Sequence, residues 1–174
     1  MSKGRIHLYT GEGDGKTMNA FGLALRAIGH DQRVVVVQFM KGRGDEIGEY
    51  RIQDRLKPLY EVHQFGRKEF IDFKNPMQED YVLARQGLEF AKKALKSRPD
   101  LLILDEINLA VHFNILPLKD VLTLLREIPP ETTVVLTGRR APQELIEMAD
   151  LVTEMRMVKH PYEKGAPARK GVEY

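Results

Sequence analysis

The sequence predicts an α/β protein with a mostly parallel central sheet and helices on both faces of that sheet. Three apolar runs, at 33–37, 101–104 and 133–136, are too short to form helices and lack a polar face. Such runs are typical of strands that are buried on both sides. Segments with helical spacing alternate with them along the chain, and this alternation favours a parallel sheet.

The first half of the chain begins with a strand and a helix. Apolar residues at 6–9 predict the strand, and 18–28 has the mixture of apolar and polar residues of an amphipathic helix. A weaker strand is expected at 60–65, followed by a long irregular segment at 66–76. Apolar residues at intervals of three and four then predict a helix over 78–97 with a single apolar stripe.

Proline residues precede both helices that we expect in the second half. Pro117 introduces a helix over 118–128, and Pro142 introduces another over 143–149, because proline is favoured where a helix begins. A short strand over 151–153 is the last regular element expected. The chain has 174 residues and shows neither an internal repeat nor a linker, so we expect one domain over 1–174.

Composition and charge exclude several classes of protein. Hydrophobic residues make up 43% and charged residues 30%, which is the balance of an ordinary globular domain. The net charge of +2 gives no strong field for nucleic acid. No apolar stretch approaches a membrane span or a signal peptide, so we expect a cytoplasmic protein without a membrane partner. With no cysteine, the chain has no disulfide and no iron–sulfur cluster, so any electrons must come from outside.

A glycine-rich stretch between the first strand and the first helix predicts a phosphate site. Residues 11–17 read Gly-Glu-Gly-Asp-Gly-Lys-Thr, one residue shorter than the common phosphate-binding loop. Glycines let backbone N–H groups surround phosphate oxygens, and the following helix adds its positive end. Lys16 would place a charge on the phosphates, and the Thr17 hydroxyl is suited to Mg²⁺. The alternative is a turn that caps an ordinary helix, with Lys16 in solvent.

Four of the expected strands end where a polar loop begins. The residues at these four points are Gly11, Gln38, Asp105 and Thr137. Ligands of parallel sheets bind outside the carboxyl ends of the strands, so we expect these residues at one edge. Asp105 and Glu106 then suggest a carboxylate pair for Mg²⁺. The alternative for this pair is the start of a helix, where acidic side chains accept backbone N–H bonds.

Two arginines, Arg139 and Arg140, are expected at the same edge. Guanidinium groups suit phosphate because they form paired hydrogen bonds. The alternative is a solvated loop in which one arginine pairs with Glu144 or Glu147. The five histidines lack metal-ligand spacing and are taken as structural or exposed, although His160 lies in basic surroundings that set it apart.

Several motifs along the whole chain together resemble one family, the ATP:corrinoid adenosyltransferases of the P-loop type. The shortened glycine loop is part of that family's pattern. The other matching segments are 21–27, 38–42, 104–106, 137–139, 149–155, 158–161 and 171–174. Members of the family act on cob(I)alamin or cob(I)yrinic acid a,c-diamide.

The resemblance implies a RecA-like fold, usually a homodimer, that moves the 5′-deoxyadenosyl group of ATP onto cobalt(I). Tripolyphosphate is released, and the reaction belongs to adenosylcobalamin biosynthesis or salvage. ATP lies reversed in this family, so the loop would hold the terminal phosphate while C5′ faces cobalt. Cobalt(I) is itself the nucleophile, and the protein's work is orientation and charge stabilisation. A flavoprotein is the electron donor that the resemblance implies.

The resemblance also assigns roles to single residues. The triphosphate would be bound by Gly11, Glu12, Gly13, Asp14, Gly15, Lys16 and Thr17. Lys16, Thr17 and Glu106 are the expected catalytic residues, and the expected Mg²⁺ ligands are Thr17, Asp105 and Glu106. Further residues expected to bind ATP or corrinoid are Gln38, Lys41, Arg139, Phe65 and Phe70.

One segment departs from the family's pattern. Bacterial relatives carry an aromatic Gly-Phe-Thr-Trp stretch that packs against the corrin, and residues 65–70 stand in its place here. Either Phe65 or Phe70 could supply the apolar wall. Two other functions use the same loop and acidic pair, namely an ordinary NTPase or kinase and a non-catalytic ATP- or corrinoid-binding protein. The reaction products distinguish them.

Overall fold

A six-stranded parallel sheet forms the centre of this computed structural model, which describes residues 4–160, 167 and 169–172. The strand order is β3-β2-β4-β5-β1-β6. The strands are β1 (Arg5–Thr10), β2 (Val34–Phe39), β3 (Tyr60–Phe65), β4 (Leu101–Asp105), β5 (Thr133–Thr137) and β6 (Leu151–Glu154). Each pair of neighbouring strands in this sheet is parallel, which confirms the α/β class predicted from the buried apolar runs.

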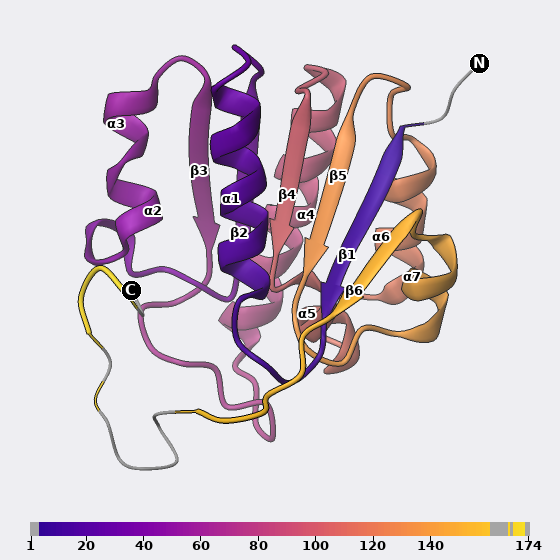
Figure 1. Cartoon of the computed structure of the whole chain (residues 1–174). Helices are drawn as coiled ribbons and strands as arrows, with labels where there is room; N and C mark the ends of the chain where they lie inside the picture. Colours follow the sequence, from indigo (N-terminus) through magenta and orange to yellow (C-terminus); the bar gives the residue numbers. More distant parts are fainter. Residues whose placement is uncertain (1–3, 161–166, 168, 173–174) are drawn as a thin grey trace.

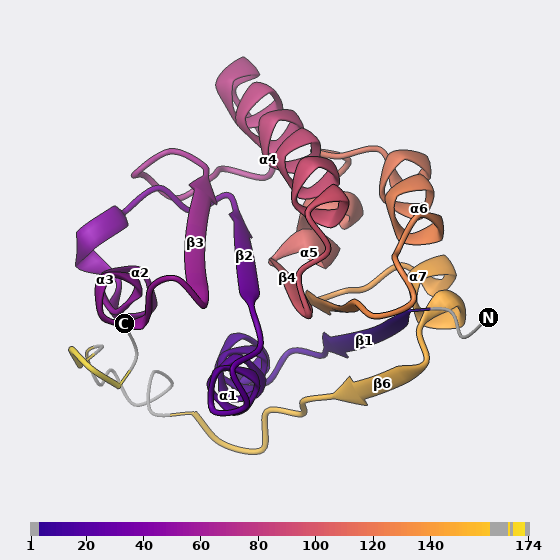
Figure 2. The same cartoon turned by 90° about the horizontal axis from the view of Figure 1, so that it is seen from above.

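Helices cover both faces of the sheet (Figures 1 and 2). One face carries α1 (Lys16–Ile28), and the other carries α4 (Gln78–Lys96), α6 (Leu118–Arg126) and α7 (Gln143–Met148). The four predicted helices are therefore confirmed, with ends that differ by no more than two residues. The short helices α2 (Gly48–Arg51), α3 (Gln53–Leu56) and α5 (Ile107–His112), and the 3₁₀ turn η1 (Gly44–Glu46), were not predicted.

The core is divided between the two faces because side chains of a strand alternate in direction. Val34 and Val36 of β2 pack with Ala20 and Ala24 of α1. The intervening valines of β2 belong to the larger cluster under α4, α5 and α6. All six residues of β2 are buried, as expected for a central strand with a helix layer on each side.

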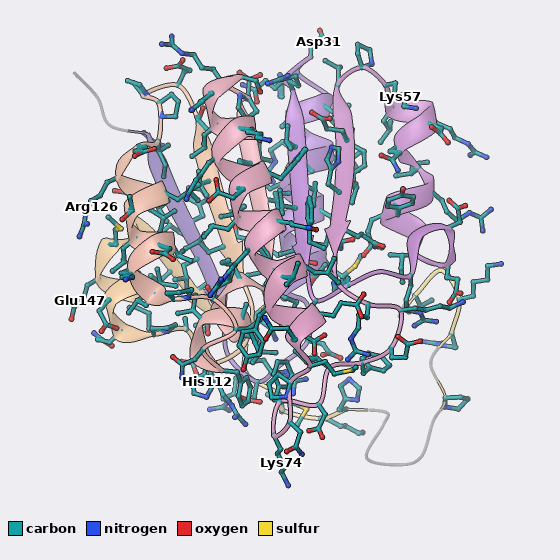
Figure 3. All side chains as sticks on the ribbon, turned by 180° about the vertical axis from the view of Figure 1, so that it is seen from behind. Asp31, Lys57, Lys74, His112, Arg126 and Glu147 are labelled. Carbon is teal, nitrogen blue, oxygen red and sulfur yellow. The ribbon has the colours of Figure 1, made fainter. Side chains whose placement is uncertain are left out.

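The carboxyl ends of the strands meet at one edge, the lower edge of Figure 1. Figure 3, drawn from behind, places His112 and Lys74 at this edge and Asp31 and Lys57 at the opposite one. The irregular segment at 66–76, which contains no helix or strand, therefore lies at the same edge as the glycine loop. Among the described residues, no helix is both long and apolar enough to cross a membrane.

Candidate nucleotide site

The glycine loop connects β1 to α1 and needs glycine at two positions because of its backbone shape. Gly11 and Gly15 have φ angles of 97° and 102°, a left-handed conformation that residues with a side chain rarely adopt. A Cβ atom on Gly11 would lie 2.4 Å from the carbonyl oxygen of Met155. The Gly13 N–H donates to that same oxygen at 2.7 Å. The segment that follows β6 therefore shapes the outer side of the loop.

Lys16 is the first residue of α1 and is only 5% exposed. Its ammonium group donates to the carbonyl oxygen of Gly13, so the side chain folds back along the loop. Burial lowers the pKa of Lys16, and the nearby charge of Arg139 lowers it further. The solvated lysine of the alternative interpretation is therefore wrong. A buried ammonium group beside backbone glycines provides a positive charge that gains from an anionic partner.

A row of polar residues crosses the ends of four strands on the face that α1 covers. Gln38 is in register with Gln64 of β3 on one side and with Asp105 of β4 on the other. Thr137 ends β5 and donates its hydroxyl hydrogen to Asp105 at 2.7 Å. The predicted meeting of Gln38, Asp105 and Thr137 at one edge is confirmed by these contacts. Gln64 was not predicted to belong to the row.

Asp105 is fully buried and accepts four hydrogen bonds. Its Oδ1 accepts from the hydroxyls of Thr17 at 2.8 Å and Thr137 at 2.7 Å. Its Oδ2 accepts from Gln38 Nε2 at 3.0 Å and from Lys41 Nζ at 2.7 Å. Burial alone would raise the pKa of Asp105, but the Lys41 charge and the hydrogen bonds lower it overall. Asp105 is therefore an ionised anchor beneath the start of α1.

Glu106 follows with a left-handed backbone, at a φ of 65°, and precedes α5. Its N–H donates to the Thr137 hydroxyl oxygen at 2.9 Å, and its Oε2 is buried with no hydrogen-bond partner among the described residues. Burial and then the charge of Asp105 raise the pKa of Glu106. The pair does stand at the start of a helix, because Glu106 occupies the N-cap position of α5, but the expected side-chain cap is not formed. An unpartnered carboxylate oxygen in such a place is suited to a cation or a donor ligand.

The oxygen atoms near Thr17 fit Mg²⁺, which prefers carboxylate, hydroxyl, water and phosphate oxygens. The Thr17 hydroxyl and Glu106 Oε2 are such donors. Asp105 already has a donor on each of its four lone-pair positions, so it would act on the metal through Thr17. In the described part of the chain, no three His, Cys, Asp or Glu side chains gather at one point. Phosphate and water oxygens would therefore complete the coordination.

A cleft of about 620 Å³ lies next to Lys16, Thr17 and Glu106, which form part of its lining. One wall is formed by the loop and the start of α1, and the other by the segment around α2 and α3. Figure 1 shows where these helices lie. Its lining residues are Asp14, Gly15, Lys16, Thr17, Met18, Phe21, Lys41, Gly48, Glu49, Ile52, Glu106, Arg139, Gly171 and Val172. The cleft thus combines the cationic groups of the site with an apolar side.

Other predicted site residues lie around the cleft in different ways. Asp14 lines it and bonds to His160, while Glu12 faces outward to Arg139 and Arg140, each at 3.5 Å. The pairing of an arginine with Glu144 or Glu147 is not found, because the loop brings Glu12 closer. Gln38 is fully buried, with both ends of its amide bonded, and is absent from the cleft lining.

The two phenylalanines expected against the corrin lie apart from the cleft lining. Phe65 packs on Phe90 of α4, with ring centroids 5.6 Å apart, on the face opposite α1. Phe70 is 91% exposed on the 66–76 segment. Of the motifs at the end of the chain, Pro161, Glu173 and Tyr174 lie outside the described residues.

The sequence interpretation missed several residues of the cleft wall. Gly48, Glu49 and Ile52 belong to short helices, or lie between them, and a length of four residues leaves no periodic signal. Met18 was expected only as the first residue of the helix over 18–28. The structure shows that its side chain is 63% exposed near the start of α1, which the sequence pattern alone did not indicate.

Comparisons with known proteins identify the family of this chain. Residues 2–174 match the family model described as ATP:corrinoid adenosyltransferase BtuR/CobO/CobP. A corrinoid adenosyltransferase of Escherichia coli (strain K12) is 37% identical over 173 residues, covering 99% of this chain and 86% of the relative. One from Sinorhizobium sp is also 37% identical, over 174 residues, covering 99% of this chain and 81% of the relative. Corrinoid adenosyltransferase CobA of Salmonella typhimurium (strain LT2) is 34% identical over 174 residues, covering 99% of this chain and 86% of the relative. A full-length family match and relatives above 30% identity lead to one conclusion: the chain belongs to the ATP:corrinoid adenosyltransferase family of enzymes.

Proposed function

We propose that this enzyme transfers the 5′-deoxyadenosyl group of ATP to the cobalt(I) of a corrinoid and releases tripolyphosphate. The observation that carries the proposal is the cleft in which Lys16, Thr17 and Glu106 meet. In the reaction, the electron pair of cobalt(I) forms the cobalt–C5′ bond. The C5′–O5′ bond breaks, its electron pair leaves with the tripolyphosphate, and cobalt becomes formally cobalt(III).

The residues of the cleft have distinct roles in this proposal. The backbone of residues 11–17 and the ammonium group of Lys16 hold the triphosphate, and Arg139 adds positive charge at the cleft. These charges stabilise the negative charge that develops on the leaving oxygen. Because cobalt(I) is the nucleophile, no side chain has to remove a proton. The protein accelerates the reaction by holding C5′ in line with the metal and the leaving group.

Thr17 and Glu106 are the residues that would hold Mg²⁺, with Asp105 orienting the Thr17 hydroxyl through its hydrogen bond. When bound, the ion would neutralise charge on the triphosphate oxygens. The four donors on Asp105 favour this indirect role over direct ligation.

The corrinoid would enter beside the apolar part of the cleft. Met18, Phe21 and Ile52 form part of its lining, and a flat, largely apolar corrin face suits such a wall. We propose that Phe70 or Phe65 closes the face of cobalt, with Phe70 the better placed because its ring is exposed on the 66–76 segment. Lys74 of this segment lies at the same edge of the sheet as the cleft (Figure 3).

The broader setting follows the family pattern and the composition. We propose a single domain over 1–174 that works as a homodimer in the cytoplasm, in adenosylcobalamin biosynthesis or salvage. The chain has no cysteine, so an external donor, by family resemblance a flavoprotein, would supply electrons to cobalt.

The proposal is tested by incubating the protein with ATP, Mg²⁺ and chemically reduced corrinoid. The expected result is loss of the cobalt(I) absorption, formation of a light-sensitive cobalt–carbon product and release of one tripolyphosphate per product. Lys16→Ala should cost about 2–4 kcal/mol of transition-state stabilisation, the effect of removing one preorganised charge. ADP and phosphate as the main products, formed at the same rate without corrinoid, would instead establish an NTPase.

A further inference from the structure

Two glutamine side chains connect the cleft wall around α2 and α3 with Asp105, the carboxylate that accepts a hydrogen bond from Thr17. The backbone N–H of Gly44 donates to Gln64 Oε1 at 2.7 Å. Gln64 Nε2 donates to Gln38 Oε1 at 2.8 Å, and Gln38 Nε2 donates to Asp105 Oδ2 at 3.0 Å. We call this chain of three hydrogen bonds, from Gly44 to Asp105, the glutamine relay.

The two ends of the glutamine relay determine its direction. Gly44 can offer only an N–H here, so the carbonyl end of Gln64 must face it. The Asp105 carboxylate only accepts, so the NH₂ end of Gln38 must face it. Both amides are therefore held in one orientation, and each bond directs a donor hydrogen toward the ionised carboxylate. Hydrogen bonds that run in one direction polarise one another and strengthen the contact with the charge.

Both ends of the relay matter for the cleft. At one end, Asp105 holds the hydroxyl of Thr17, which lines the cleft at the start of α1. At the other end, Gly44 begins the turn that leads to Gly48 and Glu49 in the opposite wall. Lys41, on the same connection, is a second attachment because it also bonds to Asp105. The relay and Lys41 together tie one wall to the other.

We propose that Gln64 and Gln38 are positioning residues that set the distance between the two walls of the cleft. They do so because the segment from Lys41 to Glu49 and the Thr17 hydroxyl are both hydrogen-bonded to Asp105, the segment through Lys41 and the relay. Neither glutamine side chain lines the cleft, so their effect reaches ATP only through Thr17, Lys41 and the wall. This inference rests on the proposed function, since it takes ATP as the occupant.

The direction of the relay provides a sharp variant, Gln64→Glu. The substituted carboxylate keeps the acceptor for the Gly44 N–H and nearly the same shape, but it has no hydrogen to donate to Gln38. Gln38 would then turn its NH₂ group toward the new carboxylate and its carbonyl oxygen toward Asp105, where two acceptors would face each other. Losing a hydrogen bond to a charged group typically weakens an interaction about tenfold to a hundredfold.

Gln53→Glu is the matched control. Gln53 also accepts a backbone N–H through its Oε1, from Val62 at 3.2 Å, and it lies in α3 on the same side of the sheet. This control adds the same charge and keeps the same kind of acceptor, but it lies outside the relay. ATP affinity is measured by calorimetry with Mg²⁺ and without corrinoid, and the melting temperature is measured without nucleotide.

We expect Gln64→Glu to weaken ATP binding at least about tenfold, whereas Gln53→Glu changes it less than about twofold. Equal affinity for wild type and Gln64→Glu, or equal losses in the two variants, would overturn the proposal. Failure of the wild-type protein to bind ATP would refute the proposed function instead, so the two failures are distinguishable.

A double variant tests the direction of the relay in a second way, by comparison with both single variants. Adding Asp105→Asn to Gln64→Glu supplies an NH₂ group that can donate to the turned carbonyl of Gln38, so the two bonds made by Gln38 reverse while the Gly44 N–H still donates to residue 64. The substitution also removes the acceptor of Lys41, but the single Asp105→Asn variant has the same loss, which therefore cancels in the comparison. The carbonyl oxygen of the new asparagine can still accept from Thr17. The double variant should therefore bind ATP about tenfold more tightly than the two single effects combined would give. Simple additivity of the two substitutions would contradict the relay.

Discussion

At the scale of single residues, Glu106 shows how the site trades stability for function. Its side chain is partly buried beside Asp105, and its Oε2 atom is buried without a hydrogen-bond partner in the described structure. A buried acceptor without a partner typically costs about 1–3 kcal/mol. Such a cost persists where a ligand makes use of the group.

We predict that Glu106→Gln raises the Mg²⁺ concentration needed for half-maximal activity by about tenfold or more. The melting temperature should be equal or higher, because a neutral amide replaces a carboxylate that burial disfavours. Magnesium titration of the initial rate, together with thermal unfolding without ligand, checks both parts. An unchanged Mg²⁺ requirement would remove Glu106 from the metal site.

The contacts of single residues also show what the sequence alone could not reveal. The types of residue in the site were predictable, since a glycine loop and a strand ending in two acids have few other uses. Their partners were not, because Arg139 and Arg140 meet Glu12 across the tertiary fold. Gln64 was missed for the same reason, as its place beside Gln38 depends on the strand register.

At the scale of elements, β1 contains a histidine whose protonation opposes folding. Burial lowers the pKa of His7, the charge of Arg5 lowers it further, and its Nδ1 is buried without a partner among the described residues. In the unfolded chain His7 has an ordinary pKa of about 6.5. As pH falls through that value, the unfolded chain gains a proton that the folded chain resists, so stability decreases.

We therefore predict that His7→Gln makes the stability less sensitive to mild acid. Between pH 7.5 and pH 5.5, the free energy of unfolding should fall more for the wild type than for the variant. Urea unfolding at the two pH values measures this difference, and comparing the two proteins cancels the contribution of other groups. Identical falls in the two proteins would show that His7 has the same pKa in both states.

The irregular segment between β3 and α4 contains the second element-scale prediction. Phe70 is 91% exposed, whereas Phe73 stacks on Phe113 with ring centroids 4.2 Å apart. If Phe70 displaces the axial ligand of cobalt(II), Phe70→Ala should slow adenosylation roughly tenfold when electrons pass through cobalt(II). The rate with cobalt(I) supplied directly should barely change, and neither should the melting temperature.

Phe73→Ala is the control for this prediction. Its ring is part of a stacked pair, so the variant should lower the melting temperature and affect the two assays alike. If Phe70→Ala reduced both rates equally, its ring would have no special role in the reduction of cobalt(II).

The elements themselves were predictable to different degrees. Buried strands and long amphipathic helices were recognised because their periodicity extends over enough residues to be distinctive. The helices α2, α3 and α5 have only four to six residues and were missed. Tertiary contacts stabilise such short helices, since an isolated helix of this length does not form. These missed elements supply part of the cleft wall and the segment that follows Glu106.

At the scale of the whole molecule, composition leads to a prediction about electrons. The chain has no cysteine and therefore no thiol or iron–sulfur route for reducing cobalt. We expect no turnover when purified protein is mixed with ATP, Mg²⁺ and cobalt(III) corrinoid. Addition of a reduced flavoprotein should restore product formation, followed by absorption spectroscopy. Turnover without any added reductant would contradict this expectation.

The strand order has a consequence for how the molecule is made in the cell. β1 leaves the ribosome first among the strands, yet its two neighbours in the sheet are β5 and β6, the last strands of the described chain. At typical rates of translation, the roughly 120 residues between β1 and β5 take on the order of 6–25 s to synthesise. The glycine loop follows β1 directly, and its Gly13 N–H donates to Met155, which is synthesised after β5. We therefore expect the loop to have no fixed shape during that interval. For the same reason, we expect a nascent chain of this enzyme to acquire its affinity for ATP only after β6 and Met155 have been synthesised.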